Sequence, residues 1–356
     1  MELLVLGGTS FAGRHVVARA LAEGHSVTIF NRGRTNPDLF PETRSLRGDR
    51  ASGDYECLKG AGPFDAVVDV CAYVPRAVRE AVAALGPDGI GGPYILISSV
   101  SAYAEPSDGD AAAAGFTEDS PLARLPHGID PASEEVTGET YGPLKVLTER
   151  AAEALLPGAV MVVRPGLIVG PHDPTDRFTY WVRRMDDGGE VLAPESPDLA
   201  RTQVVHAADM AEWIVASAAD GRTGTYNAVA PPVPLAHVLD AAGRAAGRAT
   251  GGATASAGGR AAEVIWVPWE FLEAEGVAPW VDLPAWVPAP MARLLAADGS
   301  RAAAAGLPSR PVDAVVADVA AWDRTRAGAP LRTGLSRERE TELLSRFRAA
   351  GPPPGP

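Results

Sequence analysis

The residues with the clearest chemical potential are a tyrosine and a lysine four positions apart, Tyr141 and Lys145. On a helix, side chains at this spacing project from the same face one turn apart, so the ammonium can lie near the phenol. A nearby cation favours the phenolate and lowers the tyrosine pKa from its ordinary value of about 10. The pair could then exchange a proton with a substrate, as general acid–base catalysis requires. Any helix surface can carry such a pair by chance, so the rest of the chain has to decide.

A serine supplies the third candidate group. The apolar run at residues 94–97 predicts a buried strand, and Ser98 and Ser99 follow its end. Serines at strand ends are often simple turn caps. The combination of Ser99 with Tyr141 and Lys145 on the following helix favours a catalytic role, and Tyr103, four residues beyond Ser99, is a candidate for substrate contact.

The start of the chain reads as a strand, a glycine turn and a helix. An apolar run at residues 2–6 precedes Gly-Gly-Thr-Ser-Phe-Ala-Gly, and a helical pattern continues to Gly24. Such a turn brings backbone N–H groups and a helix N-terminus to a pyrophosphate. The fingerprint is degenerate because a serine occupies the position of the middle glycine. We expect a dinucleotide here, contacted by Gly7, Thr9, Ser10, Phe11 and Gly13.

The end of the second strand bears on which dinucleotide binds. Residues 26–30 form the strand, and Asn31 and Arg32 follow it. NAD-binding proteins usually place an acid here for the ribose 2′-hydroxyl, whereas an arginine accommodates a 2′-phosphate. The sequence therefore favours NADP(H), with NAD as the alternative. In the competing interpretation, Arg32 only stacks on adenine or faces solvent.

Two further strands end in candidate cofactor contacts. Asp49 and Arg50 close a short third strand, and Asp49 offers an acceptor for the adenine amino group. The fourth run, residues 66–72, ends in Cys71 and Ala72, whose small side chains leave room for a cofactor at the carboxyl edge of the sheet.

Six such strands, the last at residues 160–163, alternate with helical patterns. This order predicts an α/β fold with a doubly wound parallel sheet, Rossmann-like, and a smaller, partly helical C-terminal substrate domain. We assign residues 1–170 and about 203–232 to the dinucleotide-binding domain, and about 171–202 and 233–350 to the substrate domain. Residues 351–356, rich in proline and glycine, are expected to be disordered.

Composition excludes several classes of function. A formal net charge of −13 argues against nucleic acid and anionic membranes as partners, because both attract excess Lys and Arg. No apolar run approaches membrane-spanning length and no signal peptide is apparent, so we expect a cytoplasmic protein. The two cysteines, Cys57 and Cys71, have no metal-ligand spacing, and we expect no metal.

These motifs together resemble the extended or atypical short-chain dehydrogenase/reductase superfamily, often called the NAD-dependent epimerase/dehydratase family. The resemblance rests on the glycine turn, Ser99 with Tyr103, Tyr141-x-x-x-Lys145, Arg164-Pro165-Gly166, and Gln203 to Ala211. It extends to about residue 232. Within the superfamily, the chain looks like the branch that includes chloroplast stem-loop-binding proteins and bacterial reductase-like proteins.

The resemblance implies an enzyme with a catalytic trio. Tyr141 would exchange a proton with the substrate oxygen, Ser99 would hold that oxygen, and Lys145 would lower the tyrosine pKa and bind the nicotinamide ribose. Pro165 and Gly166 would pack beside the nicotinamide. Further candidates for substrate contact are Tyr73, Tyr103, His172 and Arg177, although an Asp176–Arg177 ion pair would be an equally good account of the last.

The sequence departs from the nucleotide-sugar enzymes of this superfamily. Their usual asparagine after the sixth strand and arginine before the histidine strand correspond here to Leu167 and Thr202. Our leading hypothesis is therefore an NADP(H)-preferring oxidoreductase that reduces a carbonyl or imine-like group of a small, fairly apolar metabolite. The alternatives are an epimerase or dehydratase that recycles its cofactor internally, and a nonenzymatic nucleotide-sensing or RNA-associated protein. A homodimer remains open.

Overall fold

The computed structural model describes residues 1–104, 115–130, 132–247 and 261–350. The predicted disordered tail at residues 351–356 lies outside this described part. Within it, the chain forms two compact units. Over the described residues, unit 1 comprises residues 1–104, 115–130, 132–168, 205–230 and 297–309, and unit 2 comprises residues 169–204, 231–247, 261–296 and 310–350. The stretch 297–309, which the sequence analysis assigned to the substrate domain, thus groups with unit 1.

Unit 1 is built on a seven-stranded parallel sheet of order β11-β6-β5-β4-β1-β2-β3. This confirms the predicted doubly wound, Rossmann-like fold. Its strands are β1 (Glu2–Leu6), β2 (Ser26–Asn31), β3 (Arg44–Arg47), β4 (Ala66–Asp69), β5 (Tyr94–Ile97), β6 (Val160–Pro165) and β11 (Gly224–Ala228).

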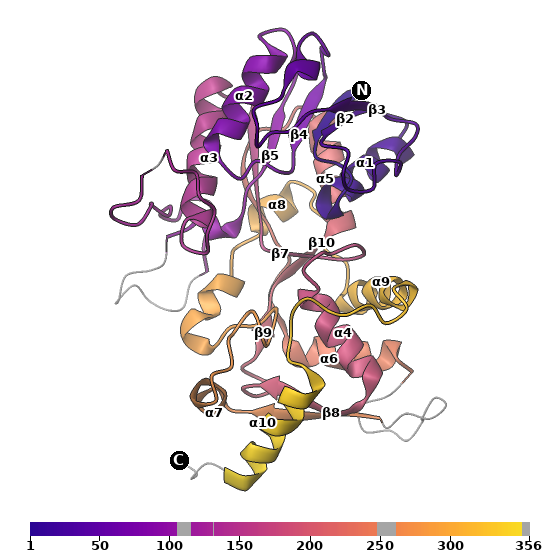
Figure 1. Ribbon diagram of the computed structural model, residues 1–356, viewed down its shortest axis with the longest axis vertical. Coiled ribbons are helices and arrows are strands. Elements are labelled where there is room, and N and C mark those ends of the chain that lie inside the picture. The colour runs from indigo at the N-terminus through magenta and orange to yellow at the C-terminus, as the bar shows by residue number, and fades with distance from the viewer. Residues whose placement is uncertain (105–114, 131, 248–260, 351–356) are drawn as a thin grey trace. The chain divides into compact units, whose positions relative to one another are not determined.

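Helices cover both faces of this sheet (Figure 1). The alternation of side chains along β1 shows why its residues are all apolar: Leu3 and Val5 pack into one core, and Leu4 and Leu6 into the other. The first core includes α1 (Phe11–Ala22), α5 (Ala207–Ala219) and α8 (Ser300–Ala304), and the second includes α2 (Pro75–Leu85) and α3 (Tyr141–Leu155). Short 3-10 helices η1 (Glu56–Leu58) and η2 (Val100–Ala102) and strands β7 (Leu167–Val169) and β10 (Val204–His206) complete the elements of this region.

Unit 2 combines helices with short paired strands. Strands β8 (Gly189–Pro194) and β13 (Ala262–Val267) pair in parallel, and β9 (Arg201–Thr202) and β12 (Val233–Pro234) pair antiparallel. The other elements are α4 (Arg177–Asp187), α6 (Leu235–Ala245), α7 (Trp269–Ala274), η3 (Ala289–Leu295), α9 (Val312–Thr325) and α10 (Arg337–Ala350). This agrees with the prediction of a partly helical C-terminal portion.

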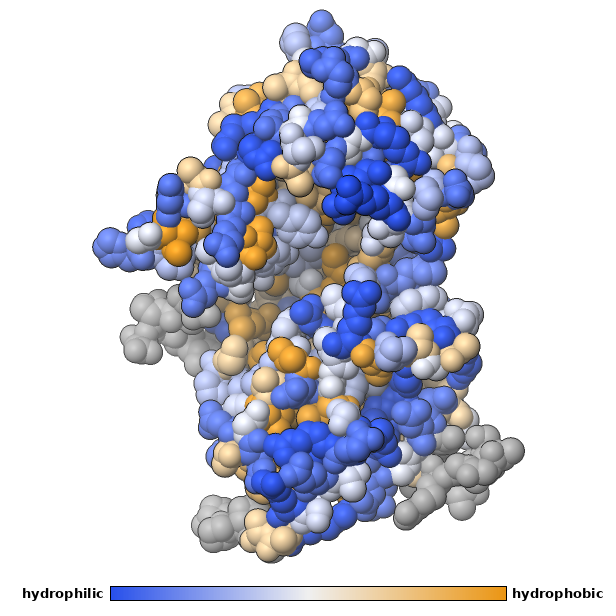
Figure 2. Space-filling model, viewed as in Figure 1, coloured by the Kyte–Doolittle hydropathy of each residue, from blue (hydrophilic) through white to orange (hydrophobic). Residues whose placement is uncertain are grey.

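The face of the molecule in Figure 2 is mostly hydrophilic, as expected when large apolar side chains collect in cores. Trp181, Trp213 and Trp286 are among the largest fully buried side chains. None of the helices in the described ranges is long and apolar enough to cross a membrane.

Candidate active site

The glycine turn between β1 and α1 has the close packing that a dinucleotide cradle needs. Gly7 has φ +117°, and a Cβ added there would lie 2.4 Å from Val70 Cγ2. A Cβ on Gly13 would lie 2.7 Å from the backbone nitrogen of Gly8. Only glycine therefore lets the first turn of α1 approach the end of β1, where the N–H groups of a helix start lack intrahelical acceptors and can hold an anion. The residues fit a pyrophosphate.

The other predicted residues of the turn lie at its surface or brace it. Ser10 is exposed at the N-cap of α1, and its side chain makes no capping hydrogen bond. Thr9 is buried, and its hydroxyl accepts a hydrogen bond from Asn31 Nδ2 at 3.3 Å. Phe11 begins the helix with a positive φ of 24°. Ser10 is thus free to meet a ligand, whereas Thr9 ties the turn to the end of β2.

The end of β2 carries a cation that the sequence analysis did not identify. Asn31 Oδ1 accepts hydrogen bonds from the Gly33 backbone at 2.7 Å and from Arg47 Nη1 at 2.5 Å. Arg47 ends β3, which pairs with β2 so that Asn31 and Arg47 are register partners. Arg32 is exposed next to them. The predicted Asn31–Arg32 site therefore has a second guanidinium, and only the strand pairing could have revealed it.

Asp49 forms its hydrogen bond within a local turn, whereas the side chain of Arg50 points into the protein. Asp49 Oδ1 accepts from the Ala51 backbone within its own turn at 3.0 Å. The guanidinium of Arg50 points into the protein, with hydrogen bonds to both carboxylate oxygens of Asp69 at 2.6 and 2.7 Å and to the Ala77 carbonyl at 2.9 Å. Since these contacts occupy it, the expectation that the Arg50 side chain binds the cofactor does not fit this geometry.

Lys145 lies where strands β4 and β5 end. Its side chain is only 3% exposed, and its Nζ donates to the carbonyls of Ala72 at 2.8 Å and Ile97 at 2.9 Å. Nζ also lies 4.8 Å from the ring centre of Tyr73 and 5.8 Å from that of Tyr141. The predicted pairing of Tyr141 with Lys145 is therefore present, and Ala72 contributes a backbone acceptor. Cys71, beside it, is partly buried.

Burial sets the acidity of this lysine. Loss of hydration lowers the pKa of Lys145 from 10.5 to about 8, against the opposing negative charge of Asp69. Near neutral pH the ammonium form still predominates. A desolvated cation beside a phenol favours the phenolate, which is the relation that the spacing of Tyr141 and Lys145 suggested.

The first turn of α3 packs directly on the segment that carries Ser99. A Cβ added at Gly142 would lie 2.0 Å from the carbonyl oxygen of Ser101, two residues beyond Ser99. The Ser99 hydroxyl accepts a hydrogen bond from the Ser101 backbone at 3.1 Å and caps η2. Tyr141 is the first residue of α3, next to Gly142. This close approach brings the segments of Ser99 and Tyr141 together.

Pro165 and Gly166 end β6 beside β11. Pro165 is buried and in register with Ala228. Gly166 follows β6, and a Cβ there would lie 2.9 Å from Val229 Cγ1, so a larger residue would require the Val229 side chain to move.

A buried polar network lies behind the trio. Arg164 Nη2 donates to Glu149 Oε2 at 2.6 Å and Nη1 donates to the Tyr103 hydroxyl at 3.0 Å. The Tyr103 hydroxyl donates in turn to Asn227 Oδ1 at 2.5 Å, and Ser98 Oγ donates to Glu149 Oε1. Tyr103 is 5% exposed. Its hydroxyl is occupied inside the protein, which argues against the predicted substrate contact, whereas Tyr73 is 48% exposed and remains accessible.

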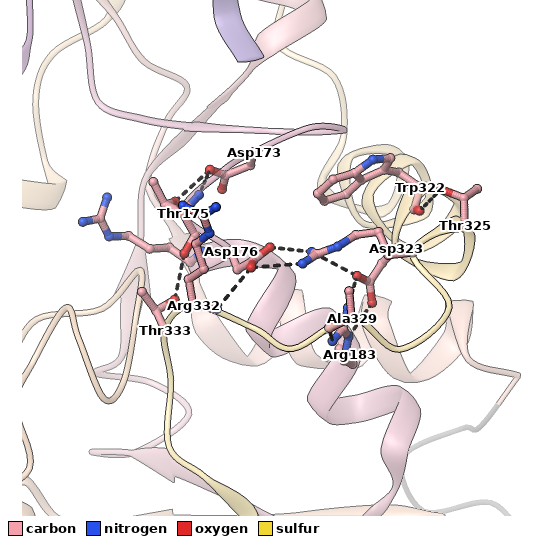
Figure 3. Close-up of polar contacts among 12 residues, drawn as sticks. Asp173, Thr175, Asp176, Arg183, Trp322, Asp323, Thr325, Ala329, Arg332 and Thr333 are labelled. Carbon is pink, nitrogen blue, oxygen red and sulfur yellow. Dashed lines mark hydrogen bonds and ion pairs between the residues drawn. The ribbon is translucent and has the colours of Figure 1, made fainter. Parts of the chain in front are cut away.

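Two predicted substrate residues, His172 and Arg177, lie in unit 2. The His172 ring packs edge-on against Trp322 at 5.6 Å, and the Arg177 guanidinium lies 5.3 Å from the ring centre of Trp280. Asp176, the partner that the alternative interpretation gave to Arg177, binds Arg326, with Nη1 at 2.5 Å, and accepts a hydrogen bond from the Arg332 backbone at 3.2 Å (Figure 3).

The structure thus adds residues that the sequence analysis did not single out: Arg47 at the end of β3, Asp69 at the end of β4, and Glu149, which forms a buried ion pair with Arg164 of the Arg164-Pro165-Gly166 motif. Each of these residues forms its hydrogen bonds with a partner 15 to 19 positions away in the chain. The periodicity of apolar residues does not show which of such distant positions come into contact. Among the described residues, no group of three or more His, Cys, Asp or Glu side chains could hold a metal ion.

Comparison with known proteins identifies a family whose model matches most of the chain. The model of the NAD dependent epimerase/dehydratase family matches residues 3–229. A search of curated proteins finds no match.

Several solved structures share the fold. One is UDP-glucose 4-epimerase from Thermus thermophilus in complex with NAD, with 19% identity, a TM-score of 0.61, and coverage of 93% of this chain and 100% of that one. Another is UDP-glucuronic acid 4-epimerase from Bacillus cereus in complex with NAD, with 14% identity, a TM-score of 0.60, and coverage of 91% and 99%. A third is the Bordetella bronchiseptica enzyme WbmH in complex with NAD+, with 17% identity, a TM-score of 0.63, and coverage of 91% and 98%.

Proposed function

Because this chain belongs to the NAD-dependent epimerase/dehydratase family, we propose that it reduces a carbonyl or imine-like group of a small metabolite. Members of this family are NAD(P)-dependent enzymes of the short-chain dehydrogenase/reductase type, and we propose NADP(H) as the preferred cofactor of this one. The observation that carries this proposal is the desolvated Lys145 ammonium, fixed by two strand-end carbonyls beside the Tyr141 ring.

The mechanism assigns one task to each group. In this reduction, a bound nicotinamide would supply the hydride to the carbonyl carbon. Tyr141 gives its phenolic proton to the substrate oxygen, and Ser99 donates a hydrogen bond to that oxygen. Lys145 stabilises the negative charge left on Tyr141 and, with its remaining N–H, reaches the ribose of the cofactor. Gly7, Ser10 and Gly13 leave the start of α1 open to the pyrophosphate.

Replacement of Tyr141 by Phe tests the proposal directly. We expect turnover to fall by about 10²–10⁴-fold, because the proton donor is removed while the ring is kept. Binding of the nicotinamide nucleotide, followed by fluorescence, should survive. Tyr226→Phe is the matched control, since the Tyr226 hydroxyl donates a local hydrogen bond to the Thr223 carbonyl, three residues away. Unchanged turnover in Tyr141→Phe would refute the assignment.

Arg47 and Arg32 support the preference for NADP(H). Arg32 follows the end of β2, and Arg47 ends β3 beside Asn31, so a 2′-phosphate at this edge would meet guanidinium groups. Replacement of Arg47 by Ala should weaken NADPH binding by about tenfold, the value of one charge-assisted hydrogen bond, and leave NADH binding unchanged. Arg44→Ala, at the other end of β3, is the control. Equal affinity of the unmodified protein for NADPH and NADH would refute the preference.

The second candidate is an epimerase or dehydratase that oxidises and re-reduces its cofactor within one cycle. The family and the solved epimerases with NAD favour it, whereas Leu167 and Thr202 replace residues that nucleotide-sugar enzymes commonly use. A purified protein that carries tightly held NAD, and shows substrate conversion without net change in nicotinamide absorbance, would establish this alternative.

The third candidate is the nonenzymatic nucleotide-sensing or RNA-associated protein. Retention of the protein on RNA at physiological salt, without cofactor-dependent turnover, would favour it.

A further inference from the structure

The buried carboxylate of Asp69 has no part in the mechanism so far. It ends β4, and its side chain is inaccessible to solvent. Besides the two hydrogen bonds from Arg50, it accepts from the Tyr94 hydroxyl at 2.6 Å and from the Cys71 backbone at 3.1 Å. Burial alone would raise the pKa of Asp69, but Arg50 and these hydrogen bonds hold it below its ordinary value. The group is therefore a carboxylate at neutral pH.

Its hydrogen bonds fix the turn that holds Lys145. The Cys71 backbone, bound to Asp69, immediately precedes Ala72, whose carbonyl accepts from Lys145 Nζ at 2.8 Å. Arg50 holds the same segment through a hydrogen bond to Cys71 Sγ at 3.2 Å, and it also donates to the Ala77 carbonyl of α2 at 2.9 Å. Displacement of the Asp69 carboxylate would thus shift Cys71 and, with it, the adjacent Ala72 carbonyl that accepts the hydrogen bond from Lys145.

The charge of Asp69 also acts on Lys145. Burial dominates the lowered pKa of Lys145, and Asp69 is the strongest of the groups that oppose it, ahead of Cys71 and Glu149, whereas Arg50 acts in the same direction as burial. The aromatic rings of Tyr73 and Tyr141 also face the ammonium. The negative charge of Asp69 therefore raises the pKa of Lys145 more than the positive charge of Arg50 lowers it.

We propose that Asp69 is the positioning residue and counter-charge for Lys145: through the Cys71–Ala72 turn it places the carbonyl that holds the ammonium, and its carboxylate balances the buried positive charge. This role rests on the proposed function only in that Lys145 acts in catalysis. A buried charge without a balancing partner would favour the neutral amine, which can neither stabilise a phenolate nor act as a cation toward the ribose.

The chain offers an unusually direct measurement, because Lys145 and Lys59 are its only lysines. In protein labelled with ¹³C-lysine, the Cε resonance of Lys145 reports its protonation, and Lys59→Arg assigns the two signals. We expect a titration midpoint near 8 in the unmodified protein. Asp69→Asn should move this midpoint to lower pH by about one unit. Asp65→Asn is the matched control, since Asp65 lies just before the other end of β4 and binds the Glu2 backbone.

Asp69→Asn leaves the buried Arg50 guanidinium without its counter-ion, which could prevent folding. A second variant is therefore measured in which Arg50 is neutralised as well. Asp69→Asn combined with Arg50→Gln removes both charges, and we expect a smaller shift in the same direction. A Lys145 midpoint that stays at the unmodified value in either folded variant overturns the proposal.

The pH profile of kcat/KM separates this inference from the proposed function. Loss of activity at high pH should begin earlier in Asp69→Asn, in step with the Lys145 resonance. A shifted resonance with an unshifted activity profile would support the counter-charge role and refute the catalytic role of Lys145, and with it the proposed function.

Discussion

At the scale of single residues, the candidate site depends on how Lys145 is buried. Its two carbonyl partners compensate for lost hydration only in part, because carbonyl oxygens carry no full charge. The protonated form of Lys145 therefore carries an uncompensated desolvation penalty, and the side chain loses its proton at a lower pH than an exposed lysine does. This combination suits a group whose charge must act on a neighbouring phenol in a water-poor site.

The lowered pKa of Lys145 predicts a pH dependence. Because the charged form is the active one, activity should be present below pH 8 and should fall as pH rises through about 8, where Lys145 loses its proton. Steady-state kinetics between pH 6 and 10, with protein stability checked at each pH, measures this. A profile that stays flat to pH 10 would contradict the assigned role.

Residue-scale interpretation from the sequence worked where the partners are close in the chain. The pairing of Tyr141 with Lys145 follows from helical spacing, and the structure shows both beside each other. The spacing could not tell that Arg50 turns inward, because its partner Asp69 lies in the next strand of the chain and meets it only after folding. The hydroxyl of Tyr103 is likewise taken by Arg164 and Asn227, from strands β6 and β11.

At the scale of elements, the contact between α3 and η2 decides how the segments of Ser99 and Tyr141 meet. Gly142 allows this contact, because any side chain there would collide with the Ser101 carbonyl. Unlike a flexible side chain, that backbone oxygen cannot move without shifting the capped turn at Ser99. The glycine is thus needed for its size rather than for its conformation.

Replacement of Gly142 by Ala should therefore separate the two elements. We expect the free energy of unfolding to fall by about 1–3 kcal/mol from overpacking, and turnover to fall with it. Denaturant unfolding and steady-state kinetics measure the two effects. Gly138→Ala is the control, since a Cβ there meets nothing within 4 Å. If both variants behave alike, the packing argument is wrong.

The elements themselves were largely predictable. Largely apolar runs identified β1, β2, β4, β5 and β6 of the parallel sheet, because strands covered on both faces need no polar alternation, whereas β3, Arg-Ser-Leu-Arg, is not such a run. Register was not predictable, and register is what places Arg47 beside Asn31. The assignment of residues 297–309 also required the structure, since Ala302 and Leu307 join a core whose other members lie far away in sequence.

At the scale of the whole molecule, a buried ion pair joins the last helix to the rest of unit 2. Glu340 on α10 is 2% exposed and binds Arg184 of α4 at 2.8 Å and the Leu192 backbone of β8 at 2.9 Å. Removal of one member of such a pair leaves the other charge buried without compensation.

Replacement of Glu340 by Ala should lower the free energy of unfolding by about 3–5 kcal/mol, measured by denaturant titration. Glu338→Ala, an exposed position on the same helix, is the control. Affinity for NADPH at low denaturant should not change, because the glycine turn and the end of β2 belong to unit 1. A loss of stability no greater than that of Glu338→Ala would show that the pair is not needed.

The discontinuity of unit 1 has a consequence for biosynthesis. Strand β11 pairs with β6, yet residues 169–204 are translated between them, and residues 231–296 precede the segment with α8. During translation, β6 therefore remains an exposed edge of the sheet while residues 169–204 of unit 2, the first of its three segments, leave the ribosome. Exposed edges invite pairing with other chains. The interval before residue 228 leaves the ribosome is thus the period in which chaperones have most to protect.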